Sequence, residues 1–354
     1  MTEYIFYGAV DINTNIIWRA MSYVENRGGK VICIVDDNPG KWSDGRWPRK
    51  VCGREIIKEY PSAIIVILSS AVKEICKALK ESGIDNKIVA YPLFRYWFPC
   101  ADIDEVNSFI NSWTEDNADK LQEIYKSEDK ETNFILSQII EQRKMTKFSF
   151  VDVESMFGFH YKDYFFDVTL QPQDETLTLV DCGAYQGDSL HRLYTLFGNR
   201  VRKAYAFEPD KDNMRLLKAR MNFVENVECI EAGVSDEEKV YRFAGNAMTG
   251  HLSESGDTEV NVCRIDDVVR EVYGKLCIMM DVEGYEVAAI KGAKKTIQKY
   301  RPYIIACLYH KPKDILDVPS MIRDICPDYD FYLRAGTHTE CYAIPHGHMS
   351  YNSN

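Results

Sequence analysis

The sequence predicts an α/β protein in which a small doubly wound domain and a helical connector precede a larger, seven-stranded sheet. Short apolar runs alternate with segments of helical periodicity along most of the chain, as in βαβ units. Several of these runs end in an acidic residue and a turn that contains glycine. The length of 354 residues suggests two domains. We expect the small domain over residues 1–100, the connector over 101–150 and the larger domain, with an antiparallel last strand, over 151–354.

Four strand-like apolar runs separated by helical segments predict the small domain. The runs are residues 4–7, 31–35, 63–68 and 87–90. The first turn, residues 8–13, contains a single glycine, whereas the dinucleotide fingerprint needs three, so we do not expect NAD to bind. This domain is similar to the small Rossmann-like domains of nucleotide-sugar-modifying proteins. A docking or scaffold role and a degenerate nucleotide-sugar site both remain open.

The connector is predicted from a polar helical pattern over residues 101–147. We expect its helices to pack over the ligand site or to pair two protomers, which would make the protein a homo-oligomer. The charged run at residues 126–132 is expected to be a solvated turn between helices.

The larger domain is organised around residues 177–189, where an apolar strand runs into Asp181 and then into a turn from Gly183 to Gly187. A helix with one apolar face follows the turn. A strand, a glycine turn and a helix in this order bring bare backbone and a positive helix terminus up to a ligand. The residues expected to contact that ligand here are Asp181, Gly183, Ala184, Tyr185, Gly187 and Asp188.

A second apolar strand ends in Glu208, about 20 residues after the last glycine of this turn, where an acid can accept hydrogen bonds from a ribose diol. The turn lacks the G-x-G-x-x-G pattern, and Asp181 suits a cationic amino group better than a pyrophosphate. These features together indicate S-adenosylmethionine, with two ordinary βα turns as the alternative. After a third strand, Gly233 and Val234 are placed to flank the adenine or form only a tight turn.

Carboxylate and imidazole side chains end the next two predicted strands. Asp281 and Glu283 follow the fourth strand, where open α/β sheets bind ligands, although Glu283 and Glu286 also suit the first turn of the next helix. His310 ends the fifth strand on the same side. We take Asp281, Glu283 and His310 as candidate catalytic residues, with His310 or Asp281 as the base and Asp281 also as a cofactor contact. They are compatible with a divalent metal, but the sequence does not indicate one.

Several motifs of the larger domain occur in the order found in the FkbM-type methyltransferase family, which this part of the chain resembles. They are Asp-Val-Glu-Gly-Tyr-Glu at 281–286, the turn at 181–188, Phe-Glu-Pro-Asp at 207–210, Arg-Ile-Asp-Asp at 264–267, Gly-Ala at 292–293, Leu-Tyr-His at 308–310 and Tyr-Leu-Arg at 332–334. The resemblance covers roughly residues 164–343. It implies a class I methyltransferase fold, S-adenosylmethionine as donor and usually transfer to a hydroxyl oxygen. A sugar or polyol acceptor is implied by the resemblance alone. Arg264 departs from the family, which commonly has a small residue there.

The composition argues against several other classes of function. The net charge is −11 and no basic block is present, so nucleic acid and anionic membrane surfaces are not expected partners. No apolar run approaches the roughly 18 residues of a membrane span, and the first residues lack the features of a signal peptide, so we expect a cytoplasmic protein. The 11 cysteines include no C-x-x-C pair, which argues against structural zinc and fits buried free thiols.

These features together predict an S-adenosylmethionine-dependent O-methyltransferase that acts on a small molecule or a glycan. A nucleotide-sugar oxidoreductase is one alternative, and the missing glycines of the first turn argue against it. A binding or scaffold protein with a relic methyltransferase fold is the other. The intact Asp181, Gly183, Gly187 and Glu208 argue against that alternative.

Overall fold

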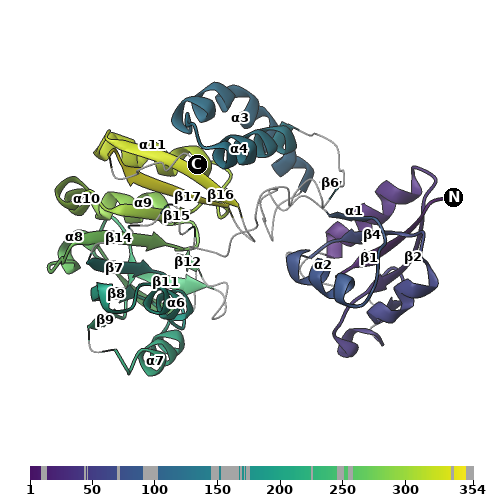
Figure 1. Cartoon of the computed structure of the whole chain (residues 1–354), viewed down its shortest axis with the longest axis horizontal. Helices are drawn as coiled ribbons and strands as arrows, with labels where there is room; N and C mark the ends of the chain where they lie inside the picture. The colour runs from purple at the N-terminus through teal and green to yellow at the C-terminus, as the bar shows by residue number, and fades with distance from the viewer. Residues whose placement is uncertain are drawn as a thin grey trace. The chain divides into compact units, whose positions relative to one another are not determined.

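In the computed structural model, the chain forms two compact units (Figure 1). The first unit is Met1–Glu115 with Ile139–Tyr161, and the second is Asp116–Gln138 with Lys162–Asn354. The structure describes residues 1–8, 14–43, 45, 47–69, 72–90, 103–144, 151–152, 167, 170, 172, 176–224, 226–244, 251–253, 258–335 and 339–347. None of the helices among these residues is long and apolar enough to cross a membrane.

The first unit contains a six-stranded sheet with the order β3-β2-β1-β4-β5-β6. Its first five strands pair in parallel, and β6 pairs antiparallel with β5. The strands are β1 (Glu3–Tyr7), β2 (Lys30–Val35), β3 (Val51–Cys52), β4 (Ile64–Ile67), β5 (Ile88–Ala90) and β6 (Val151–Asp152). The helical segments between them are α1 (Thr14–Glu25), α2 (Val72–Glu81) and the short 3₁₀ helices η2 (Pro39–Lys41) and η3 (Arg54–Glu59).

Alternate residues of the central strand β1 pack on opposite faces of this sheet. Phe6 belongs to a core cluster with Ile17 of α1, whereas Ile5 and Tyr7 belong to a second cluster with Leu79 of α2. Because side chains alternate along a strand, a continuous apolar run produces a sheet that is covered on both faces. The predicted small doubly wound sheet is confirmed, although the two-residue strands β3 and β6 were not predicted. The turn at residues 8–13 lies largely outside the described residues.

Two helices form the connector, as its polar periodicity predicts. They are α3 (Ile103–Ile124) and α4 (Lys130–Lys144). The turn between them belongs to the second unit, where Tyr125 donates a hydrogen bond of 2.8 Å to the carbonyl of Ile315. In that turn, Oδ2 of Asp129 lies 2.7 Å from Nη1 of the buried Arg334. The prediction that residues 126–132 are a solvated turn is therefore wrong at Asp129, because a buried arginine from a distant strand binds it. Pairing of protomers through the connector stays a prediction.

The second unit contains a seven-stranded sheet with the order β16-β17-β15-β14-β7-β8-β9 (Figure 1). Strand β17 pairs antiparallel with both of its neighbours, and the remaining pairs are parallel. The predicted seven strands with an antiparallel last strand are confirmed. The strands are β7 (Leu177–Cys182), β8 (Val201–Phe207), β9 (Val227–Ile230), β14 (Lys275–Met280), β15 (Tyr303–Cys307), β16 (Tyr329–Ala335) and β17 (Thr339–Pro345).

Helices of the second unit pack against this sheet through apolar faces. Leu193 and Leu217, from the first two helices, share a core cluster with Leu179 and Met279 of the sheet. The helices are α6 (Asp188–Phe197), α7 (Lys211–Arg220), α8 (Ile265–Val268), α9 (Glu286–Gly292), α10 (Lys294–Tyr300) and α11 (Asp314–Ile325), with the 3₁₀ turn η5 (Gly198–Arg200) after α6.

A small second sheet in this unit was not predicted from the sequence. Its order is β10-β13-β11-β12, and its strands are β10 (Gly233–Val234), β11 (Lys239–Ala244), β12 (His251–Ser253) and β13 (Thr258–Cys263). The sequence suggests a third strand within 227–235 that ends in a small-residue turn, and a flexible loop over 245–256. The strand is confirmed as β9, but Gly233 and Val234 of the expected turn form β10. His251 of β12 pairs with Ala244 of β11, which corrects the expected loop at residues 251–253, and the rest of that loop lies outside the described residues. These pairings are made by backbone groups of separate segments, which leave no local signal.

Candidate functional site

The predicted site residues gather at the carboxyl ends of the central strands of the seven-stranded sheet. Asp181 lies in β7, Glu208 directly follows β8, Asp281 directly follows β14, and His310 lies just past β15. Strands β7 and β14 are neighbours, and the order of strands along the chain reverses between them. Open α/β sheets bind ligands in the crevice at such a switch point. The structure therefore brings the predicted cofactor and catalytic residues to one edge of the sheet.

The turn after β7 requires glycine for two different contacts. Gly183 has φ of 82°, and a Cβ on it would collide with the carbonyl oxygen of Asp281. Gly187 has φ of 79°, and a Cβ on it would lie 2.7 Å from Cδ1 of Leu217. The amides of Gly183 and Ala184 donate to the carbonyl of Phe207 at 3.0 and 2.9 Å. The turn is thus held against β8 on one side and against the loop after β14 on the other.

Glu208 is bound by the backbone of the glycine turn and of its own loop. Its Oε2 accepts a hydrogen bond of 2.8 Å from the amide of Tyr185, and its Oε1 accepts one of 2.8 Å from the amide of Asp210. Glu208 is only 5% exposed. Burial raises the pKa of Glu208 to about 7, although both amide hydrogen bonds favour the ionised form. The side chain of Asn213 also forms a hydrogen bond with this carboxylate, and the acceptor capacity that remains suits a ribose hydroxyl.

Asp181 is buried and connects its strand to the following helix. Its Oδ2 accepts a hydrogen bond of 2.7 Å from the hydroxyl of Ser189 in the first turn of α6. Burial raises the pKa of Asp181 to about 7, and the hydrogen bond from Ser189 opposes this shift. Asp188, the first residue of α6, is exposed. An anionic residue in this position stabilises a helix start and can also interact with a cationic ligand.

Gly233 and Val234 lie in the small sheet beside the loop that carries Glu208. They form β10, which pairs in parallel with β13 through Val262 and Cys263. A Cβ on Gly233 would lie 3.9 Å from Cβ of Pro209. The two residues are thus close to the ribose candidate, as an adenine contact requires.

His310 lies among three carboxylates, which we call the histidine cluster: Asp281, Glu283, Glu286 and His310. Its Nδ1 lies 2.8 Å from Oε1 of Glu286. On the other side of the ring, Nε2 lies 3.3 Å from Oδ1 of Asp281 and 3.4 Å from Oε2 of Glu283. The imidazole side chain is 8% exposed, and its buried Nε2 makes no hydrogen bond within the described part of the chain. All three predicted catalytic residues therefore meet at one nitrogen atom.

Glu286 and Tyr309 complete this site, and sequence reasoning did not assign them a role in it. Glu286 is fully buried, and its Oε1 accepts from the amides of Val282 (3.2 Å) and Gly284 (3.4 Å) as well as facing His310. The hydroxyl of Tyr309 donates to Oδ1 of Asp281 at 2.9 Å. Glu286 begins α9, so its sequence position suggests helix capping alone. The sequence signal for a role of Glu286 in the site was its position five residues after Asp281, in the motif at 281–286.

The backbone at Glu283 is unusual for a residue with a side chain. Glu283 has φ of 53° and Gly284 has φ of 91°. Left-handed conformations are uncommon outside glycine, and they concentrate at functional sites where the surroundings hold them in place. The side chain of Lys311 donates to the carbonyl of Gly284 and so fastens this turn from the side of β15.

The carboxylates determine the protonation of the histidine cluster. Burial opposes a charged imidazole, but the hydrogen bond with Glu286 and the charges of Glu286, Asp281 and Glu283 outweigh it and raise the pKa of His310 to about 9. Partial burial, opposed by His310, raises the pKa of Glu283 to about 7. In the ligand-free protein the imidazole therefore holds a proton at neutral pH.

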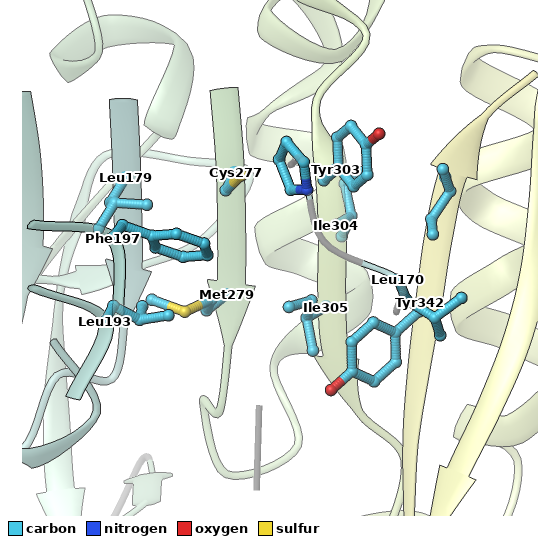
Figure 2. A pocket seen from close by; sticks show the side chains of 12 residues that line it. Leu170, Leu179, Leu193, Phe197, Cys277, Met279, Tyr303, Ile304, Ile305 and Tyr342 are labelled. Carbon is cyan, nitrogen blue, oxygen red and sulfur yellow. The ribbon is translucent and has the colours of Figure 1, made fainter. Parts of the chain in front are cut away.

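An apolar cavity of about 20 Å³ lies on one face of the seven-stranded sheet and is separate from these residues (Figure 2). Phe197 and Leu193 of α6 line it on one side and Tyr342 of β17 on the other, with Met279 and Ile305 between them. None of the predicted cofactor or catalytic residues lines this cavity. On this measure a cavity needs roughly 10–15 Å³ to hold one water molecule, so this void in the apolar core is far too small for a cofactor.

Comparison with known proteins shows what the second unit is similar to. Residues 181–332 match the model of the methyltransferase FkbM domain, a range that includes every predicted site residue. The crystal structure of the methyltransferase FkbM from Methylobacillus flagellatus is similar over 97% of this chain and 90% of that chain, with a TM-score of 0.61 and 19% identity. This likeness supports the fold across nearly the whole chain.

More distant structures share only part of the chain. A putative rRNA methylase from Clostridium thermocellum matches 51% of this chain and 94% of its own, with a TM-score of 0.35 and 14% identity. Fibrillarin from Aeropyrum pernix, in complex with natively bound S-adenosyl-L-methionine, matches 49% of this chain and 69% of its own, with a TM-score of 0.32 and 13% identity. No curated protein matches the sequence.

Proposed function

Because residues 181–332 match the model of the methyltransferase FkbM domain, we propose that the protein transfers a methyl group from S-adenosylmethionine to a hydroxyl oxygen. The observation that carries this proposal is the placement of two groups at adjoining strand ends. The glycine turn and Glu208 lie at one side of the switch point, and the histidine cluster lies at the other. The close approach of Gly183 to the backbone of Asp281 joins them.

The first group is suited to hold the cofactor. Glu208 accepts hydrogen bonds from the ribose hydroxyls with the acceptor capacity that its partners within the protein leave open. Asp181 and the turn up to Gly187 hold the methionine end, whose amino group is cationic. Gly233 and Val234 flank the adenine from the small sheet, on the side of Pro209.

The second group is suited to receive the acceptor. The acceptor oxygen attacks the methyl carbon in line with the carbon–sulfur bond, and the bonding electrons remain on the sulfur of S-adenosylhomocysteine. The hydroxyl proton has to leave during this step. Asp281 and Glu283 are the groups that take it up or weaken its bond, and His310 can take it up once its own proton has left. Clustered carboxylates also accept hydrogen bonds from neighbouring hydroxyls, which favours a small sugar, a polyol or a glycan as acceptor.

Cofactor binding tests this proposal most directly. Titration calorimetry should show that S-adenosylhomocysteine binds the full-length protein. Two charge-assisted hydrogen bonds, each worth about 1.5–3 kcal/mol, link Glu208 to the ribose in our proposal. Glu208→Ala should therefore weaken binding on the order of 100-fold while the protein stays folded.

The matched control for this experiment is Glu228→Ala. Glu228 lies in the neighbouring strand β9 with a half-exposed side chain that pairs with Lys203, and its loss should leave the affinity unchanged. Unchanged affinity in Glu208→Ala would refute the ribose assignment. Stabilisation by NAD instead of S-adenosylhomocysteine would favour an oxidoreductase. Transfer of labelled methyl groups to fractionated glycans would then identify the acceptor.

A further inference from the structure

We propose that Asp281, Glu283 and His310 bind a divalent cation, and that the cation lies where the acceptor hydroxyl arrives. The position of the acceptor rests on the proposed function, whereas the binding of the cation does not. One ligand atom from each of these residues lies within 4.8 Å of the ligand atoms of the other two. Two carboxylate oxygens and one imidazole nitrogen are a donor set that divalent metals of the Mn²⁺ to Zn²⁺ series accept.

The orientation of His310 is the strongest observation in favour of a cation. Its Nδ1 faces Oε1 of Glu286 at 2.8 Å, so this nitrogen donates and Nε2 is the atom left to bind a ligand. Metal-binding histidines usually donate their second ring nitrogen to a carboxylate in this way, which fixes the ring and its tautomer. Nε2 is buried, makes no hydrogen bond within the described residues and is directed at the two carboxylates.

The spacing of the donor atoms fits a cation between them. Ligands about 2.1 Å from a metal lie about 3.0 Å apart at octahedral angles and about 3.4 Å apart at tetrahedral angles. The observed separations from Nε2 are 3.3 Å to Asp281 and 3.4 Å to Glu283. An imidazole and two carboxylates can therefore converge on one ion without a rearrangement of the backbone.

The surroundings orient the oxygen ligands and leave room for substrate. Tyr309 donates to Oδ1 of Asp281, so this ligand also has an outer partner. Glu283 is held in its left-handed conformation by the turn that Lys311 fastens, and its side chain is 41% exposed. Three protein ligands leave coordination positions open on the exposed side. An acceptor hydroxyl that occupies one of them would become more acidic, as metal-bound water does.

The competing arrangement is an internal ion pair, in which a protonated Nε2 faces the two carboxylates and no metal binds. Calorimetry and electron paramagnetic resonance with Mn²⁺ separate the two arrangements on the chelator-treated, full-length protein. We expect one equivalent of Mn²⁺ per chain, with an electron spin echo modulation from a coordinated ¹⁴N nucleus. His310→Ala should abolish this modulation.

Substitution of individual carboxylates tests the assignment further. Glu286→Gln, which removes the negative charge of the outer partner of His310, should weaken Mn²⁺ binding about 10–100-fold, and Glu283→Gln should weaken it by about 100-fold or more. Glu283 has an exposed side chain, so its variant should fold even if the fully buried Glu286 variant does not. Glu271→Gln is the control, because this exposed acid interacts with Lys203 away from the cluster and should leave binding unchanged.

Two results would overturn the inference, and both differ from a failure of the proposed function. Absence of Mn²⁺ binding would establish the internal ion pair, and binding that Glu283→Gln leaves unchanged would place the ion elsewhere. Calorimetry with S-adenosylhomocysteine on the same samples, without Mn²⁺, reports on the proposed function alone. Mn²⁺ binding without S-adenosylhomocysteine binding would refute the methyltransferase proposal and leave the cation site intact.

Discussion

Two clusters in the second unit have similar compositions and different properties. In each, one nitrogen-bearing side chain is surrounded by three carboxylates. One is the histidine cluster. The other, which we call the arginine cluster, consists of Arg334 with Asp129, Glu131 and Asp167. Arg334 Nη1 lies 2.7 Å from Asp129 and Nε lies 3.5 Å from Glu131, and Nε also donates to Asp167. Both clusters are largely buried, yet only one of them has the marks of a ligand site.

The two clusters differ in how many carboxylates the central side chain can bind through hydrogen bonds. A guanidinium is permanently charged and has five N–H donors, so it can bind several carboxylates at once. Burial opposes ionisation of Asp129, but hydrogen bonds from Thr132 and Arg334 hold its pKa below the ordinary value. An imidazole has only two nitrogens. His310 uses one of them for Glu286 and presents the other, without a hydrogen bond, to Asp281 and Glu283, and the pKa of Glu283 is raised.

The largest expected effect comes from the histidine cluster. If His310 moves a proton or holds a cation at the acceptor, His310→Asn should lower turnover by about 100- to 10,000-fold and leave the affinity for S-adenosylhomocysteine intact. Initial rates and calorimetry on the same preparation measure the two quantities. Turnover close to that of the wild type would show that this cluster is structural, like the arginine cluster. Loss of cofactor affinity would show that the acceptor side has been misplaced.

The arginine cluster should respond through stability. Arg334→Met leaves buried carboxylates without their cation and should lower the free energy of unfolding by about 3–5 kcal/mol in urea titrations. Arg323→Met is the matched control, because Arg323 is 41% exposed and lies 3.8 Å from Glu123. An exposed pair of this kind contributes at most about 1 kcal/mol. A similar, small change in both variants would mean that the arginine cluster does not hold the connector turn against β16.

Glu208 offers an intermediate case, because its buried carboxylate is held by backbone amides. Its pKa is raised from 4.5 to about 7 in the ligand-free protein, so its protonated form is favoured on folding. The resulting stability is fully present below pH 4.5 and is lost as the pH rises through 7. Glu208→Gln should reduce this pH-dependent fall in the free energy of unfolding by at most roughly 3 kcal/mol, since one pKa unit is about 1.4 kcal/mol. Thermal unfolding at pH 5 and pH 8 measures the difference. An identical pH dependence in the variant and the wild type would contradict the raised pKa.

The smallest effect is expected at the edge of the histidine cluster. Tyr309→Phe removes one hydrogen bond to Asp281, which corresponds to about 0.5–1.5 kcal/mol and a change of roughly 3- to 10-fold in turnover. Tyr273→Phe is a control in the same unit, because this residue is exposed at the opposite end of the sheet, just before β14. Equal turnover in both variants would exclude a role for Tyr309 in orienting Asp281.

Most of the correct predictions rest on patterns of residues that are close together in the sequence. The seven-stranded sheet follows from apolar runs, and the position of Asp181, Glu208, Asp281 and His310 at strand ends follows from the residue after each run. Parallel strands carry their carboxyl ends to one edge, so these side chains had to meet once the order of the strands was known. The roles of these residues toward the cofactor and the acceptor stay predictions.

The sequence by itself determined the seven-stranded sheet, the four main strands of the six-stranded sheet and the edge at which the acidic residues collect, because these depend on apolar periodicity and on chain direction. Only the tertiary structure decided which acids belong together. Glu286 is fully buried beside His310, and Asp129 is bound to Arg334 from a strand some two hundred residues away. The pairing of a buried charge depends on what the fold brings within a few ångströms, where water no longer competes. As a result, an arginine binds the carboxylates of one cluster, whereas in the other cluster a histidine nitrogen is directed at two carboxylates.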